Sequence, residues 1–130
     1  MSSFAGRTPR LMLTAKNEFL GLSFPSSGAA AGVVDTGFDG FLAVPGFAFS
    51  ELGMDQMQST TTDGVTADGR RIELRSCMGC VTLLGTRKTH DGPVVTGPGI
   101  REILVGTGLL RTLRLKLDYC AGTFGVEECG

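Results

Sequence analysis

The sequence has little net charge, no long apolar run and no leader-like start, and each shortage argues against a class of protein. Its formal net charge of −1 at pH 7 supplies too little electrostatic attraction for nucleic acid or an anionic membrane surface. No apolar run approaches the roughly 18 residues that a membrane-spanning helix requires. The first ten residues lack the apolar core of a secretory signal, so we expect a cytoplasmic protein.

Histidine and cysteine are also scarce. His90 is the only histidine, so a Ser-His-Asp or Cys-His catalytic set would depend on this one residue, and its charged surroundings predict a solvated loop instead. Cys77 and Cys80 form a CxxC pair, but Cys120 and Cys129 are too far apart for the second close pair that structural zinc sites usually have. We therefore expect reduced cysteines, no metal and no cofactor; the alternative is a metal-linked or redox-linked β protein.

Glycine, in contrast, is abundant, with 20 residues among 130. Asp-Gly pairs recur at 39–40, 63–64, 68–69 and 91–92, and such pairs are typical of turns between short strands. The chain length fits one domain with a single core. The sequence therefore predicts a mobile tail over 1–10 and a single all-β domain over 11–130, and an active site made of two halves would need two copies of the chain.

The apolar pattern places the expected elements. Residues 46–54 are the early candidate for a short helix, and residues 85–99 are expected to be mostly loop, with a short strand at most at 94–95. Alternating apolar positions and turn residues predict strands or hairpins over 11–24, 32–35, 41–45, 59–84 with a tip at 68–69, 103–106, 113–119 and 122–128.

The segment "GVVDTGFDG" at 32–40 runs two valines into Asp35 and follows it with Thr36 and Gly37. A strand end holds a carboxylate rigidly, the hydroxyl can bind a partner, and the glycine allows a turn and a close backbone approach. Two such acids facing each other cannot both ionise; one can activate a water while the other polarises a substrate carbonyl. The simpler alternative is a turn acid that caps the loop after a strand.

With "FLAVP" behind it and "ILVGTGLL" later in the chain, this motif resembles the retropepsin-like aspartic peptidases, most of all small prokaryotic members with a "DTGF" motif. The likeness covers roughly residues 11–120. It implies a closed β-barrel of six or seven strands with one or two short helices, and an obligate homodimer with one active site on its twofold axis. The resemblance implies that Asp35 is the catalytic carboxylate of each subunit, Thr36 the hydroxyl that locks the two loops together, and Gly37 a backbone contact near the substrate.

The same resemblance implies the substrate-binding residues. Phe38 and Asp39 would contact the peptide beside the catalytic loop, and the hairpin tip with Ala67, Asp68 and Gly69 would be a flap that closes over it.

The segment "ILVGTGLL" differs from the corresponding motif of the viral peptidases. These usually have Arg followed by Asn or Asp where this chain has Thr107 and Gly108. The ion pair and the hydrogen bonds of those side chains are therefore expected to be absent. The resemblance implies an aspartic endopeptidase that acts on peptides or proteins. The alternative is a catalytically inactive retropepsin-like dimer that serves as a protein-interaction module, because a fold does not imply activity.

Overall fold

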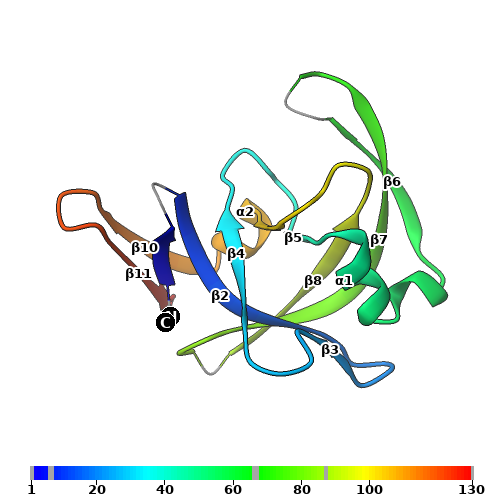
Figure 1. The fold of residues 1–130 in the computed structure, drawn as a ribbon, viewed down its shortest axis with the longest axis horizontal. Helices are drawn as coiled ribbons and strands as arrows, with labels where there is room; N and C mark the ends of the chain where they lie inside the picture. The colour runs from blue at the N-terminus through cyan, green and yellow to red at the C-terminus, as the bar shows by residue number, and fades with distance from the viewer. Residues whose placement is uncertain (1, 6–7, 66–67, 87, 130) are drawn as a thin grey trace.

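The computed structural model describes residues 2–5, 8–65, 68–86 and 88–129, and β-strands dominate it (Figure 1). The helices are short: α1 (Gly46–Glu51), a 3₁₀ turn at Met54–Gln56, and α2 (Thr107–Leu110). Within the described part of the chain, no helix has the length and apolar character to cross a membrane. The strands are β1 (Ser2–Ala5), β2 (Thr8–Asn17), β3 (Leu22–Phe24), β4 (Ala30–Val34), β5 (Leu42–Ala43), β6 (Thr60–Val65), β7 (Arg71–Leu83), β8 (Thr89–Thr96), β9 (Ile103–Val105), β10 (Leu113–Asp118) and β11 (Thr123–Glu128).

Six of these strands close into a barrel in the order β2–β4–β9–β5–β8–β7. The antiparallel pairing of β2 with β7, from Leu13 opposite Leu83 to Lys16 opposite Cys80, closes the ring. The pairs β4–β9 and β5–β8 are parallel. β1 and β3 add to β2, β6 adds to β7, and β10 with β11 forms a separate hairpin. The expectation of an all-β, closed barrel with short helices is confirmed.

The barrel interior is the hydrophobic core. Along β2 the side chains of Leu11, Leu13 and Ala15 alternate into it and are at most 1% exposed, as expected for a strand with one buried face. Phe49 of α1 covers the barrel from one side and Leu109 of α2 from another, and both are buried in the same cluster. Burying one such large side chain contributes roughly 1.5–3 kcal/mol, so this cluster stabilises the barrel.

The structure corrects two expectations about the ends and loops. The stretch 1–10, expected to be a mobile tail, contains β1 and the start of β2, which pair from Ser2 opposite Leu11 to Ala5 opposite Thr8. Residues 89–96, expected to be mostly loop, form β8, which pairs along its whole length with β7. In both cases antiparallel pairing with the adjacent strand along the chain orders a segment whose own apolar pattern is weak.

Candidate active site

Asp35 follows directly on β4, at the point where the sheet stops. Its amide donates to the carbonyl of Val105 at 3.0 Å, which extends the pairing with β9 by one residue. Its Oδ1 accepts from the amide of Gly37 at 3.0 Å, and its carbonyl accepts from the amide of Phe38 at 3.2 Å. The side chain is half-buried, so a fixed carboxylate still reaches the surface.

The loop after Asp35 is fastened to the start of α2. Three consecutive amides donate to three loop carbonyls: Gly106 to Phe41 at 3.1 Å, Thr107 to Phe38 at 2.9 Å, and Gly108 to Gly40 at 2.9 Å. Such bonds satisfy the free amides at a helix start. The loop therefore has little freedom to move relative to the barrel.

Glycine is required where this loop meets α2. A Cβ on Gly106 would lie 2.1 Å from the Gly40 oxygen and 2.6 Å from Cδ2 of Phe38, and a Cβ on Gly108 would lie 2.9 Å from the Gly40 oxygen. The sequence interpretation treated Thr107 and Gly108 as lost side-chain contacts. It missed that their backbone amides hold the loop, although the Gly-Thr-Gly spacing after an apolar strand was a signal for such an approach.

The other predicted residues near Asp35 lie on the same loop. Thr36, Gly37 and Asp39 are exposed at its surface. Phe38 is half-buried, and its ring folds over Gly40, where an added Cβ would lie 2.4 Å from Cζ of Phe38. Phe38 therefore packs against its own loop.

The predicted hairpin over 59–84 is present as β6 and β7, paired from Thr60 opposite Ser76 to Val65 opposite Arg71. Figure 1 shows that it projects past the barrel at the same end as the loop after β4. At its tip Gly69 has a φ of +85°, and the Nε of Arg70 contacts Oδ2 of Asp68 at 3.1 Å in an exposed ion pair. The predicted contact at Ala67 lies outside the described residues.

The CxxC pair does not form a two-sulfur site. Cys77 and Cys80 lie three residues apart on the continuous strand β7, so their side chains point to opposite faces of the sheet. Burial raises the pKa of the Cys80 thiol to about 12, and hydrogen bonds to Glu18 and Asp91 add to the effect. Among the residues that the structure describes, no group of three or more His, Cys, Asp or Glu side chains could hold a metal ion.

The sequence predicted that His90 lies in a solvated loop, and this prediction is wrong. It lies on β8 with a side chain 9% exposed, and its Nε2 is 3.5 Å from Oε1 of Glu128. The error arose because the polar residues around His90 resemble a loop, whereas β8 is held by its pairing with β7 and the side chain of His90 contacts Glu128 of β11.

Comparison with known proteins supplies relatives in sequence and in fold. No protein-family model matches the chain. An uncharacterized protein of Archaeoglobus fulgidus is 32% identical over 126 residues, which cover 97% of this chain and 98% of that protein. The crystal structure of a retropepsin-like aspartic protease from Rickettsia conorii matches with a TM-score of 0.63 and 17% identity, over 91% of this chain and 82% of that one. The retroviral protease-like domain of Ddi1 from Leishmania major matches with a TM-score of 0.52 and 14% identity, over 91% and 88% of the two chains.

Proposed function

The chain belongs to the retropepsin-like fold family, and we propose that it is an aspartic endopeptidase that acts as a homodimer. The observation that carries the proposal is the way Asp35 is held. Its amide is tied to Val105, one carboxylate oxygen accepts from Gly37, and the following loop is fastened to α2. A carboxylate fixed in this way at a strand end, and still partly exposed, suits acid–base chemistry because its geometry needs no rearrangement during the reaction.

A second copy of the chain completes the proposed site. Each chain has one Asp35 loop, and Thr36 and Gly37 at its turn reach the surface, so they can face the same residues of another copy. The hydroxyl of Thr36 can bridge the two loops. Two carboxylates brought together in this way cannot both be ionised, so they share one proton.

The shared proton sets the reaction. The ionised Asp35 takes a proton from a water molecule, whose oxygen attacks the carbonyl carbon of the scissile peptide bond. The protonated Asp35 of the other subunit donates its proton to the carbonyl oxygen, which gives a tetrahedral intermediate. The intermediate collapses when the bond from carbon to nitrogen breaks and the nitrogen takes up a proton, which releases an acid and an amine without a covalent enzyme intermediate.

The substrate lies between the Asp35 loop and the β6–β7 hairpin in this proposal. Asp39 lies at the surface of the loop and can bind the peptide backbone, while Phe38 forms part of the wall beside it. Asp68 and Gly69 belong to the hairpin tip, which acts as a flap, and Ala67 is assigned to it from the sequence alone. A flap must move during each turnover, and an exposed two-stranded hairpin is able to do so.

The test is cleavage of a mixed peptide library from about pH 3 to 8 by the wild type and by Asp35→Asn. Light scattering identifies the concentration at which each protein is a dimer. We expect Asp35→Asn to keep its fold and to lose activity by at least about a thousandfold, because it removes the proton acceptor. Asp55→Asn makes the same substitution at an exposed aspartate of the 3₁₀ turn and should keep wild-type activity.

Two results would contradict the proposal. Cleavage by Asp35→Asn at the wild-type rate would exclude Asp35 as the catalytic acid. A dimeric wild type that cleaves no peptide, and that a statine-type mimic of the tetrahedral intermediate does not bind, would favour the non-catalytic interaction module.

A further inference from the structure

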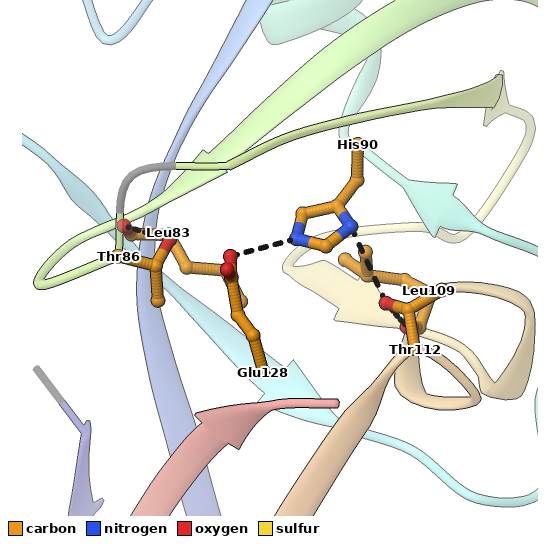
Figure 2. A network of polar contacts seen from close by, with 6 residues as sticks. All are labelled: Leu83, Thr86, His90, Leu109, Thr112 and Glu128. Carbon is orange, nitrogen blue, oxygen red and sulfur yellow. Dashed lines mark hydrogen bonds and ion pairs between the residues drawn. The ribbon is translucent and has the colours of Figure 1, made fainter. Parts of the chain in front are cut away.

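His90 lies where three parts of the molecule meet. Figure 2 shows its ring between the carboxylate of Glu128 on β11 and the hydroxyl of Thr112, which follows α2. Nε2 is 3.5 Å from Oε1 of Glu128, and Nδ1 is 3.3 Å from Oγ1 of Thr112. The side chains of His90 and Glu128 are 9% and 20% exposed, so little water reaches the contact between them, whereas Thr112 lies at the surface.

The protons on the ring follow from the neighbouring hydrogen bonds. The Thr112 hydroxyl has one proton, and it donates this proton to the carbonyl of Leu109 at 2.8 Å, close to the ideal length for such a bond. Towards His90 the hydroxyl can then only accept, so Nδ1 must carry a proton. If the ring were neutral, the bare lone pair of Nε2 would face the Glu128 carboxylate, and two buried acceptors would repel each other.

Both atoms of that contact lack another partner. Nε2 of His90 and Oε1 of Glu128 are fully buried and, within the described residues, make no hydrogen bond elsewhere. Leaving two buried polar atoms unpaired is costly. A second proton, on Nε2, turns the repulsive contact into an ion pair.

We propose that His90 is a positioning residue for the active-site loop, and that its ring does this only while it carries both protons. The charged ring binds Glu128 on one side and, through Thr112, the last turn of α2 on the other. It thereby joins β11 and α2 to the barrel strand β8. Neutralising the ring removes the attraction to Glu128 and loosens both attachments.

The path to the active site is short. Leu109, whose carbonyl accepts from Thr112, belongs to α2, and the amides of Thr107 and Gly108 at the other end of this helix hold the carbonyls of Phe38 and Gly40. A shift of α2 therefore moves the loop that carries Asp35. The role in catalysis rests on the proposed peptidase function, whereas the protonation-dependent attachment does not.

The charges around the ring determine its pH dependence. Glu128 is the charged group that faces it from β11, the junction between α2 and β10 offers the neutral Thr112, and β7 offers the apolar Val81 as cross-strand partner. On β8 itself, Asp91 lies next in the strand and so points to the opposite face. The ion pair with Glu128 needs the charged ring, so the attachment is present at low pH and is lost as the pH rises and the ring gives up a proton.

The experiment is a double-mutant cycle with His90→Gln and Glu128→Gln, measured by thermal unfolding at pH 6 and pH 8.5. All proteins carry Asp35→Asn, so neither autolysis nor the Asp35 pair affects the result. At pH 6 we expect each single variant to lower Tm by about 5 °C and the double variant to lose little more than one single variant. At pH 8.5 the losses should shrink to about 1 °C.

Glu127→Gln is the matched control. Glu127 is the neighbouring residue on β11 and forms an exposed pair with Arg114 at 3.7 Å, with side chains 74% and 70% exposed. Its loss should change Tm by less than about 1 °C at either pH. Equal Tm losses for His90→Gln at pH 6 and 8.5, or equal losses for Glu127→Gln and Glu128→Gln, would overturn the proposal.

Hydrogen exchange tests the positioning role separately from the attachment of the hairpin. At pH 6 the amides of Thr107 and Gly108 should exchange about tenfold faster in His90→Gln than in its parent, after correction for intrinsic rates. A change confined to β11 amides would overturn the positioning role, because His90 would then hold the hairpin alone.

The outcome for the attachment and the outcome for the proposed function can be told apart. One result is that the double-mutant cycle shows a larger coupling between His90 and Glu128 at pH 6 than at pH 8.5, while the wild type shows no peptidase activity. The proposed function then fails and the protonation-dependent attachment stands. If the wild type is active but shows no pH-dependent coupling between His90 and Glu128, the attachment fails and the proposed function stands.

Discussion

The Asp35 loop and the β6–β7 hairpin lie at the same end of the barrel (Figure 1) but are held in opposite ways. The loop is irregular, yet backbone hydrogen bonds tie it to β9 and α2. The hairpin is regular, yet five of the six residues of β6 are exposed and its register with β7 is its main attachment. The β6–β7 hairpin is therefore held more loosely than the Asp35 loop, although its secondary structure is regular. The reason is that local stability follows from buried contacts rather than from strand geometry.

The strand β7 contains this contrast within itself. Its first half, in the hairpin, has no buried residue, whereas the second half, from Cys77 to Leu83, is mostly buried between β2 and β8. We expect substitutions in the loop and the barrel to change the stability of the fold, and substitutions in the hairpin to change only the binding of the proposed peptide substrate.

The largest effect is expected for Gly106→Ala. The new methyl group would lie 2.1 Å from a backbone oxygen, which cannot move without breaking the bonds between the loop and α2. We expect a loss of about 3 kcal/mol in the free energy of unfolding, measured by urea denaturation, together with loss of the proposed peptidase activity.

Gly46→Ala is the control for that change. An added Cβ at Gly46 has no atom within 4 Å, and alanine favours the helix that begins there. The free energy of unfolding should stay the same or rise by up to about 1 kcal/mol. A Gly106→Ala protein as stable as Gly46→Ala would show that the loop is not clamped as described.

A smaller effect, on substrate binding alone, is expected for Val65→Thr. Val65 is 69% exposed near the hairpin tip, and threonine keeps its shape while removing apolar character. We expect KM to rise about fivefold, close to 1 kcal/mol, with Tm unchanged. Leu84→Thr, at an exposed site beyond the other end of β7, should leave KM unchanged; an unchanged KM in both variants would argue against the flap.

The smallest effect concerns the buried half of β7. The pKa of Cys80 is raised from 9.0 to about 12, so the folded protein keeps this thiol protonated in weakly alkaline solution. Its contribution to stability is therefore complete below about pH 9 and is lost only as the pH rises towards 12. At pH 8 iodoacetamide should label the exposed Cys120 at least about a hundredfold faster than Cys80, as measured by mass spectrometry. Equal labelling rates would mean that this part of the barrel opens readily.

Much of the fold could be predicted from local patterns. Alternation in β2, the turn at 68–69 and the apolar run into Asp35 each depend on a few neighbouring residues. The paired half of β8 could not be predicted, because Thr89, His90 and Asp91 become a strand only through their register with Thr82, Val81 and Cys80. The same holds for β1, which owes its order to β2.

The features of the candidate site also fall into two groups, those that the local sequence predicts and those that only the folded barrel determines. Local sequence is enough to establish an all-β chain and a strand that ends in Asp-Thr-Gly, because apolar periodicity, turn chemistry and a strand-end acid act over short distances along the chain. The folded barrel is needed to establish that the amides of Thr107 and Gly108 hold the Asp35 loop, that Gly106 must lack a side chain, and that His90 is buried against Glu128. These features are contacts between segments far apart in sequence, and their energies depend on distances of a few ångströms that the barrel alone sets.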